Sequence, residues 1–123
     1  MMMDIPDKIE IIKPWGGEEH FCFNTQVTVK ILSVKPHSSL SLQYHFKRNE
    51  FWKIIKGAAK ITVGEKIYDA KEGDEFVIPK NAKHRIETEE HHAKIMEISY
   101  GEFDAEDIVR IDDKYNRHEN KKI

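Results

Sequence analysis

The sequence predicts an all-β protein whose antiparallel strands close into a sandwich or barrel. Short runs rich in Val, Ile, Thr and aromatic residues recur along the 123 residues, and Gly, Pro and Asn interrupt them. Only the tail, at about 106–115, has the character of a helix, and then for one or two turns. We therefore expect residues 1–123 to form a single barrel domain closed by a short C-terminal helix.

The strands follow from the positions of the breaks. A weak strand at 8–13 ends at the Pro14-Trp15-Gly16-Gly17 break, and the clearest early strand is 26–34, whose residues alternate between two faces. Gly64 and Glu65 fit a two-residue hairpin with glycine first, the type II′ choice. Further strands are expected at 51–56, 58–63, 67–70, 75–78, 85–89 and 94–99, and the polar run 87–92 is expected to be an exposed loop.

Length and charge limit the function classes. A chain of 123 residues with 39% hydrophobic content has room for one core. Its 20 basic and 22 acidic side chains give a net charge of -2, which argues against the basic footprint of a nucleic-acid-binding protein. No run has the length and apolarity of a signal peptide or membrane span, so we expect a cytoplasmic protein without a membrane partner. The single Cys22 is expected to be a core or strand residue rather than a nucleophile.

The stretch 43–52 contains three types of metal ligand. If it is extended, Gln43 and His45 are two residues apart and point to the same face, and a bend would bring Glu50 toward them. An amide oxygen, an imidazole and a carboxylate are an incomplete ligand set for a divalent ion, so a fourth ligand is expected from elsewhere. His84, five positions after the turn at Pro79, is the candidate. Each residue alone could be a surface polar residue, but together they favour a metal site.

The spacing of these residues resembles the paired motifs of the cupin superfamily. Four residues separate His45 from Glu50, six more precede Gly57, and Gln43 stands where many cupins place their first histidine. A narrower resemblance, over about 13–117, is to the type II phosphomannose isomerase domain. That domain usually forms the C-terminal part of a longer enzyme whose N-terminal part is a mannose-1-phosphate guanylyltransferase. The residues that carry it include Lys13-Pro14-Trp15-Gly16, Leu40-Ser41-Leu42-Gln43, His45, Arg48, Glu50, Trp52, His84-Arg85, Glu97 and Arg110.

This resemblance implies a cupin-type antiparallel β-barrel and one divalent ion held by Gln43, His45, Glu50 and His84. Zinc is the first choice of metal, and manganese, iron, cobalt and nickel are also chemically acceptable. It implies interconversion of mannose 6-phosphate and fructose 6-phosphate through a cis-enediol. Cupins often pair through a strand edge, so a homodimer is expected. No glycine-rich phosphate loop is present, so nucleotide binding by that route is not expected.

The four arginines and one glutamate are the candidates for substrate contact. Arg48 and Arg85 adjoin proposed ligands, and either contact the substrate or hold a carboxylate such as Glu50 in place. Arg110 and Arg117 lie in a tail that resembles the Asp-Ile-Val-Arg and Tyr-Gly-Arg elements of the family, so they are expected to fold over the cavity mouth and contact a sugar phosphate. The guanidinium fork suits bidentate contact with a phosphate. Glu97 is either a proton shuttle or a charged residue at a strand edge. We therefore assign Glu97, Arg110 and Arg48 to catalysis and Arg85, Arg110 and Arg117 to substrate binding.

Three positions depart from the family, which tends to have glycine where this chain has His37, Asn81 and Asn116. These residue types are enriched at left-handed backbone angles, so the turns are expected to survive. Two alternatives to the isomerase stay open. One is another cupin enzyme, such as an isomerase or epimerase of another sugar or nucleotide-sugar, or an iron dioxygenase. The other is a non-catalytic metal- or sugar-binding cupin.

Overall fold

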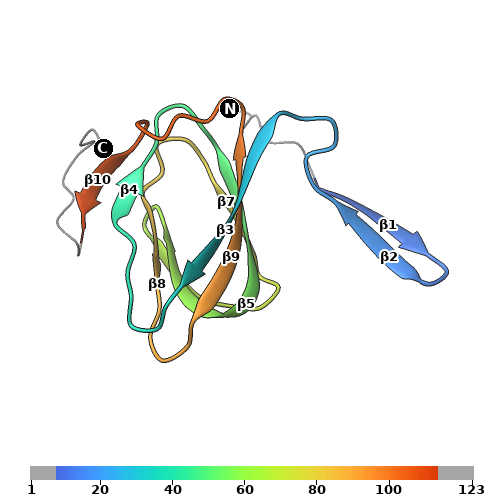
Figure 1. The fold of residues 1–123 in the computed structure, drawn as a ribbon, viewed down its shortest axis with the longest axis horizontal. Helices are drawn as coiled ribbons and strands as arrows, with labels where there is room; N and C mark the ends of the chain where they lie inside the picture. Colours follow the sequence, from blue (N-terminus) through green and yellow to red (C-terminus); the bar gives the residue numbers. More distant parts are fainter. Residues whose placement is uncertain (1–7, 114–123) are drawn as a thin grey trace.

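The computed structural model describes residues 8–113, in which every regular element is a β-strand (Figure 1). The strands are β1 (Ile9–Lys13), β2 (Gly16–His20), β3 (Val27–Val34), β4 (Leu42–Tyr44), β5 (Glu50–Val63), β6 (Lys66–Lys71), β7 (Glu75–Ile78), β8 (His84–Glu87), β9 (Ala93–Tyr100) and β10 (Val109–Asp112). Every pairing between them is antiparallel, so the predicted all-β class is confirmed. No helix capable of crossing a membrane occurs within 8–113.

Strand β5 belongs to both walls of the barrel. Its first residues, 50–53, pair with β7 and β9, and its last residues, 58–63, pair with β6 and β8. The pairing register with β9 shifts between Ile54 and Lys56, and such a bulge bends a strand. The two strands predicted on either side of Gly57 are therefore one bent strand. The resulting sheet has the order β10-β4-β8-β5-β9-β3, with β6 and β7 attached to β5.

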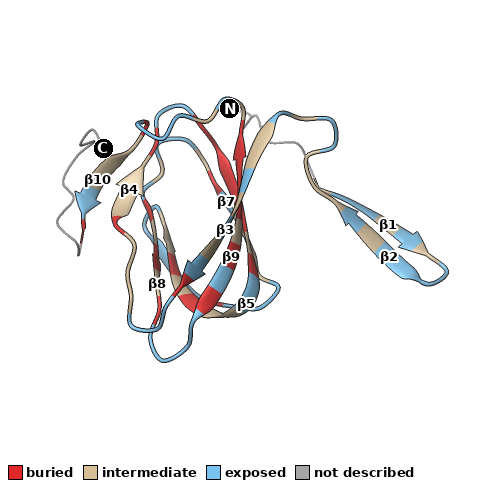
Figure 2. Ribbon diagram, in the orientation of Figure 1, coloured by how far each residue is buried: buried red, intermediate tan, exposed pale blue. Residues whose placement is uncertain are grey.

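The main core fills the space between the walls, and Figure 2 shows the buried positions gathered there. Trp52, Ile54 and Ile61 of β5 point inward and are at most 2% exposed. They pack with Ile86 of β8 and Ile95 of β9, both fully buried. Burying a side chain of this size contributes about 1.5–3 kcal/mol, so these residues are a principal source of stability.

The expected C-terminal helix is wrong within the described residues. The segment 109–112 is a strand, in which Val109 pairs with Tyr44 and Arg110 with Gln43. Its apolar and charged residues alternate, which suits a strand, and the open edge of β4 offers backbone groups that a helix would leave unpaired. Pairing with a distant strand therefore decides its conformation. Residues 114 and 115 of the expected helix lie outside the described part of the chain.

The predicted turn chemistry is present. Gly64 has a φ of 62° between the paired residues Val63 and Lys66, as a two-residue hairpin turn with glycine first requires. His37 and Asn81 have φ values of 54° and 67°, so both adopt the left-handed conformation that we expected at these positions. Asn116 lies beyond the described residues.

Gly57 is the glycine whose replacement should destabilise the fold most. Its φ is +84°, and an added Cβ would overlap the carbonyl oxygen of His92 at the close approach of β5 to β9. We expect Gly57→Ala to lower the free energy of unfolding by about 3 kcal/mol or more, measured by urea titration. Gly64→Ala is the control, because its φ is also positive but its Cβ would meet nothing within 4 Å. That variant should lose only about 1 kcal/mol, and equal losses would contradict the overlap.

Candidate metal centre

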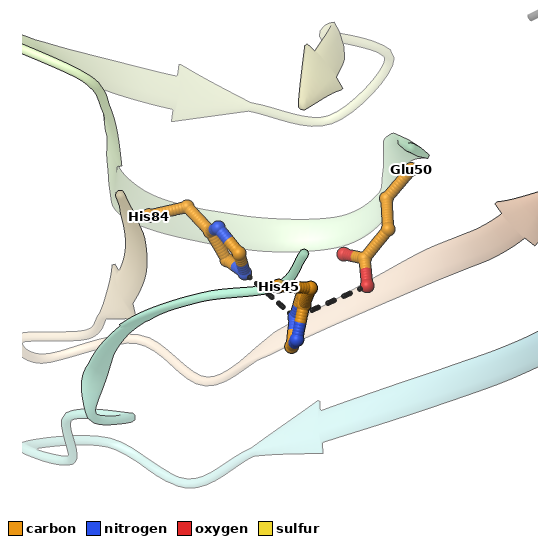
Figure 3. A group of neighbouring side chains, drawn as sticks. All are labelled: His45, Glu50 and His84. Atoms are coloured by element: carbon orange, nitrogen blue, oxygen red, sulfur yellow. Dashed lines mark hydrogen bonds and ion pairs between the residues drawn. The ribbon is translucent and has the colours of Figure 1, made fainter. Parts of the chain in front are cut away.

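Three side chains from different parts of the chain converge inside the barrel (Figure 3). His45 follows β4, Glu50 begins β5 and His84 begins β8. The Nε2 atoms of the two histidines are 3.2 Å apart, and His45 Nε2 is 3.4 Å from Glu50 Oε2. All three residues are at most 4% exposed, and their potential ligand atoms lie within 4.8 Å of one another. The structure therefore brings together three of the four predicted metal ligands.

The loop that presents His45 is held by long-range hydrogen bonds. The Asp107 carboxylate accepts the backbone N–H groups of Phe46 and Lys47, both at 2.9 Å. Asn81 donates its backbone N–H to the carbonyl of His45 at 2.8 Å, which ties the loop to the turn before β8. These contacts join three segments that are far apart in sequence. They also explain how a loop rather than a strand can position a buried imidazole.

Hydrogen bonds determine which nitrogen of each imidazole is free. His45 Nδ1 lies 2.6 Å from the carbonyl oxygen of Asp107, and His84 Nδ1 lies 2.9 Å from that of Ala82. A carbonyl oxygen can only accept, so each Nδ1 must donate and, in the neutral ring, each Nε2 carries a lone pair. Two lone pairs and a carboxylate oxygen then lie together in a buried space, where Arg48 Nη2 also donates to His45 Nε2 at 3.2 Å. A divalent cation would satisfy all three, and this donor set fits zinc and related ions.

The ionisation of the cluster also suits a metal. Burial lowers the pKa of His45 to about 4, an effect that the nearby Glu50 only partly opposes. Burial likewise lowers the pKa of His84. Burial on its own would raise the pKa of Glu50, but the hydrogen bond from Arg48 and the charges of His84, His45 and Arg48 together outweigh it and hold that pKa below the ordinary range. At neutral pH the cluster thus contains two neutral imidazoles and one carboxylate, which are the states that bind metals.

Gln43 and Arg110 share a face with His84. Gln43 pairs with His84 on one side and with Arg110 on the other, and residues directly opposite in neighbouring strands project to the same side of a sheet. Gln43 is half-buried there. This register is compatible with Gln43 as the fourth ligand. It also brings Arg110 to the same side of the sheet as the cluster.

Arg48 holds Glu50 in place. It is 6% exposed and donates from Nε to Glu50 Oε2 at 2.8 Å. Its Nη1 donates to the carbonyl of Asp104 at 3.1 Å, and its guanidinium lies 4.6 Å from the ring centroid of Phe103. The other carboxylate oxygen of Glu50 accepts from Trp52 Nε1 at 3.0 Å. Of the two roles considered for Arg48, the structure thus supports the positioning of a ligand.

Glu97 lies inside the barrel rather than at an edge. Strand β9 is paired on both sides, with Glu97 opposite Lys30 on β3 and Trp52 on β5. Glu97 is 6% exposed, and burial, aided by the charge of Glu50, raises its pKa to about 7. Lys30 Nζ is 3.9 Å from its carboxylate and 4.4 Å from the ring centroid of Phe103. The interpretation of Glu97 as a charged edge residue is therefore excluded.

The remaining arginines differ in position. Arg85 projects to the side of β8 opposite His84, where it pairs with Asp112 at 2.9 Å and Glu87 at 3.6 Å. The structure does not bring it to the cluster. Arg117 lies outside the described residues. The sequence prediction also missed three supporting contacts: Asp107 with the loop after β4, Asn49 with the backbone N–H of Lys80, and Lys30 with Glu97. No local signal could have identified them, because the partners are distant in sequence.

Comparison with known proteins supports the predicted resemblance. Residues 4–113 match the protein family described as mannose-6-phosphate isomerase C-terminal. The chain is 36% identical over 111 residues to a mannose-1-phosphate guanylyltransferase of Salmonella montevideo, covering 89% of this chain and 24% of that protein. It is 33% identical over 110 residues to the xanthan biosynthesis protein XanB of Xanthomonas campestris pv. campestris, covering 88% of this chain and 24% of that protein. The chain thus spans about a quarter of the length of these relatives.

Solved structures share the fold. Oxalate decarboxylase from Bacillus subtilis superposes with a TM-score of 0.65 at 24% identity, covering 71% of this chain and 24% of that one. A cupin 2 conserved barrel domain protein from Rhodopseudomonas palustris gives a TM-score of 0.60 at 20% identity, covering 66% of this chain and 60% of that one. At this identity the similarity shows the fold alone, and the predicted cupin-type barrel is confirmed.

Removing both histidines should abolish stoichiometric metal binding. We expect His45→Ala with His84→Ala to reduce the bound metal from one ion per chain to none, because a carboxylate and an amide remain as a weak ligand pair. Elemental analysis after dialysis measures this. The matched control is His91→Ala with His92→Ala, which removes two exposed histidines from the loop before β9. Equal metal in both double variants would refute the site.

The affinity for metal should depend on pH as the lowered histidine pKa requires. Protons compete with a metal only as the pH approaches the pKa of the free ligand, which is about 4 for His45. We expect the affinity to be nearly constant from about pH 7 to pH 5.5 and to fall below that range, whereas exposed histidines would lose metal near pH 6.5. Competition with a chromophoric chelator at several pH values measures this. A midpoint near 6.5 would contradict the assigned environment.

Proposed function

Because the chain belongs to the family of mannose-6-phosphate isomerase C-terminal domains, we propose that it is a metal-dependent isomerase of mannose 6-phosphate and fructose 6-phosphate. The observation that carries the proposal is the buried cluster of His45, Glu50 and His84, with Glu97 and Arg110 on the interior side of the same barrel. A relative named mannose-1-phosphate guanylyltransferase supports a mannose-derived substrate.

In this proposal Gln43, His45, Glu50 and His84 hold one divalent ion, with zinc as the first choice. Such an ion would supply Lewis-acid stabilisation of the negative charge that develops on the two sugar oxygens of the cis-enediol. Arg48 keeps the Glu50 carboxylate ionised and oriented through the hydrogen bond between them, which is 2.8 Å long. Loss of this hydrogen bond would weaken the binding of the ion by Glu50 without removing the carboxylate.

Glu97 is the proposed proton shuttle. The reaction moves a proton from carbon 2 of the aldose to carbon 1 of the cis-enediol, while the hydroxyl proton of oxygen 2 passes to oxygen 1. The same carboxylate can therefore accept and return the carbon-bound proton. A group is best suited to both steps when its pKa is close to the working pH, and burial raises that of Glu97 to about 7. Lys30, 3.9 Å from the carboxylate, would stabilise its ionised form before proton abstraction.

Arg110 is the proposed phosphate anchor, with Arg117 as a second contact from outside the described residues. A guanidinium can bind a phosphate through two hydrogen bonds, and fixing that end of the substrate aligns its carbon chain. Arg85 is left out of this proposal because its guanidinium pairs with Asp112 and Glu87. We further expect a cytoplasmic protein that acts on a small phosphorylated sugar.

The function is tested by an aldose–ketose assay on metal-loaded protein with a panel of sugar phosphates. Arg110→Ala should lower kcat/KM for the hexose 6-phosphate by about 100-fold, because it removes the anchor, yet leave metal content unchanged. Arg110→Lys should retain part of the rate, since it keeps the charge but not the fork. Arg85→Ala, a matched removal of an arginine that is paired elsewhere, should have little effect.

Two outcomes would contradict the proposed isomerase function. If the metal-loaded protein interconverts no aldose and ketose phosphate, the non-catalytic metal- or sugar-binding cupin takes its place. If it interconverts a different sugar phosphate and Arg110→Ala matches the parent, another sugar isomerase is the better description and the phosphate anchor lies elsewhere.

A further inference from the structure

The buried guanidinium of Arg48 contacts two of the proposed metal ligands at once. Its Nε donates to Glu50 Oε2 at 2.8 Å, and its Nη2 lies 3.2 Å from His45 Nε2. Because His45 Nδ1 donates to a backbone carbonyl, Nε2 is the acceptor of this second contact. One cationic side chain thus bridges an imidazole and a carboxylate, and it does so through the atoms that would bind a metal ion.

The two contacts of Arg48 leave different capacities for a metal ion. A carboxylate oxygen has more than one lone pair, so Glu50 Oε2 can accept from Arg48 and still bind an ion. The Nε2 atom of a neutral imidazole has a single lone pair, which either accepts a hydrogen bond or binds a metal. The contact with His45 therefore excludes metal binding by that residue, whereas the contact with Glu50 does not.

The electrostatics of the cluster also favour one cation at this position rather than two. The potential ligand atoms of His45, Glu50 and His84 lie within 4.8 Å of one another, so an ion among them would stand beside Arg48 Nη2. Two cations repel each other more strongly in a buried space than in water. An ion bound to His45 would therefore displace the nearer end of the guanidinium.

Arg48 has other partners that can hold it away from His45. Its Nη1 donates to the carbonyl of Asp104 at 3.1 Å, and its Cζ lies 4.6 Å from the ring centroid of Phe103. Both residues belong to the segment between β9 and β10, on the side of Arg48 away from the barrel wall that carries Glu50. The guanidinium can thus leave one imidazole without becoming an unpaired buried charge.

We propose that Arg48 is a built-in competitor for the metal ion, and that an ion binds the cluster only when Nη2 leaves His45 while Nε stays on Glu50. A competitor that must first leave lowers the apparent affinity for every ion by the same factor. The consequence is a raised ion concentration at which the cluster fills. This inference rests on the proposed metal site and is independent of the proposed sugar-phosphate reaction.

Solution NMR of the parent chain labelled with 15N tests the exchange directly. Before metal is added, a scalar coupling through the hydrogen bond should join Arg48 Nη2 to His45 Nε2. One equivalent of zinc should abolish this coupling and shift the Nη2 signal. The Nε–H signal of Arg48 should stay protected from exchange with water, because the bond to Glu50 persists. Elemental analysis of the same sample measures whether one ion is bound per chain.

Two substitutions of equal length separate the contacts of Arg48. The side-chain amide in Arg48→Gln ends at the position of Nε, so this variant keeps a donor to Glu50 but has no atom that reaches His45. Arg48→Met has neither contact. We expect Arg48→Gln to bind zinc about tenfold more tightly than the parent, measured by competition with a chromophoric chelator at constant pH. Arg48→Met should bind zinc more weakly than Arg48→Gln, because Glu50 loses its donor.

Arg85→Gln is the matched control, because Arg85 pairs with Asp112 and Glu87 outside the cluster. This variant should bind zinc as the parent does. The proposal is overturned if the parent binds no zinc, if the coupling to His45 is absent before zinc is added or persists afterwards, or if Arg48→Gln binds zinc no more tightly than the parent. Should Arg48→Gln fail to fold, the NMR measurement on the parent decides alone. Absence of isomerase activity alongside the expected zinc results would contradict the proposed function and support this inference.

Discussion

The burial of two imidazoles and a carboxylate in one small space is the constraint on which the rest of this structure depends. Burying a polar group without a hydrogen-bond partner costs several kcal/mol. In this structure, hydrogen bonds from surrounding residues offset much of that cost for the two imidazoles and the carboxylate. The carbonyl groups of Asp107 and Ala82 accept hydrogen bonds from the Nδ1–H groups, while Arg48 and Trp52 donate to Glu50. The two Nε2 lone pairs remain beside the Glu50 carboxylate, with Arg48 Nη2 donating to that of His45 at 3.2 Å, and a divalent cation could bind both lone pairs and the carboxylate.

This cluster is possible because β5 contributes to both walls. Glu50 at its start reaches the cluster from one wall, while Val63 at its end pairs with His84 on the other. The bulge near Gly57 bends the strand between them, so a backbone position that tolerates no Cβ is linked to the geometry of a site formed by other residues. The segment 101–107 then returns over the same end and supplies Phe103 and Asp107.

The interior of the barrel contains charged side chains, whereas its outer surface exposes apolar ones. Inside, Arg48 and Glu97 are buried, and they form ion pairs with the buried Glu50 and with the partly exposed Lys30, respectively. Outside, Val29, Ile31 and Ile12 remain exposed to water. A barrel that places charge in its interior and leaves isoleucine on its surface departs from the usual distribution of charged and apolar residues.

The sequence by itself determined most of the strands and the turns at Gly64, His37 and Asn81, because these depend on local alternation and backbone conformation. It also selected His45, Glu50 and His84 as one candidate group, through their residue types and their resemblance to a family motif. Only the tertiary structure decided that 109–112 is a strand, that Arg85 faces away from the cluster and that Asp107 holds the His45 loop. Each depends on a partner many residues distant, and a local pattern contains no information about which distant edge or carbonyl will meet it.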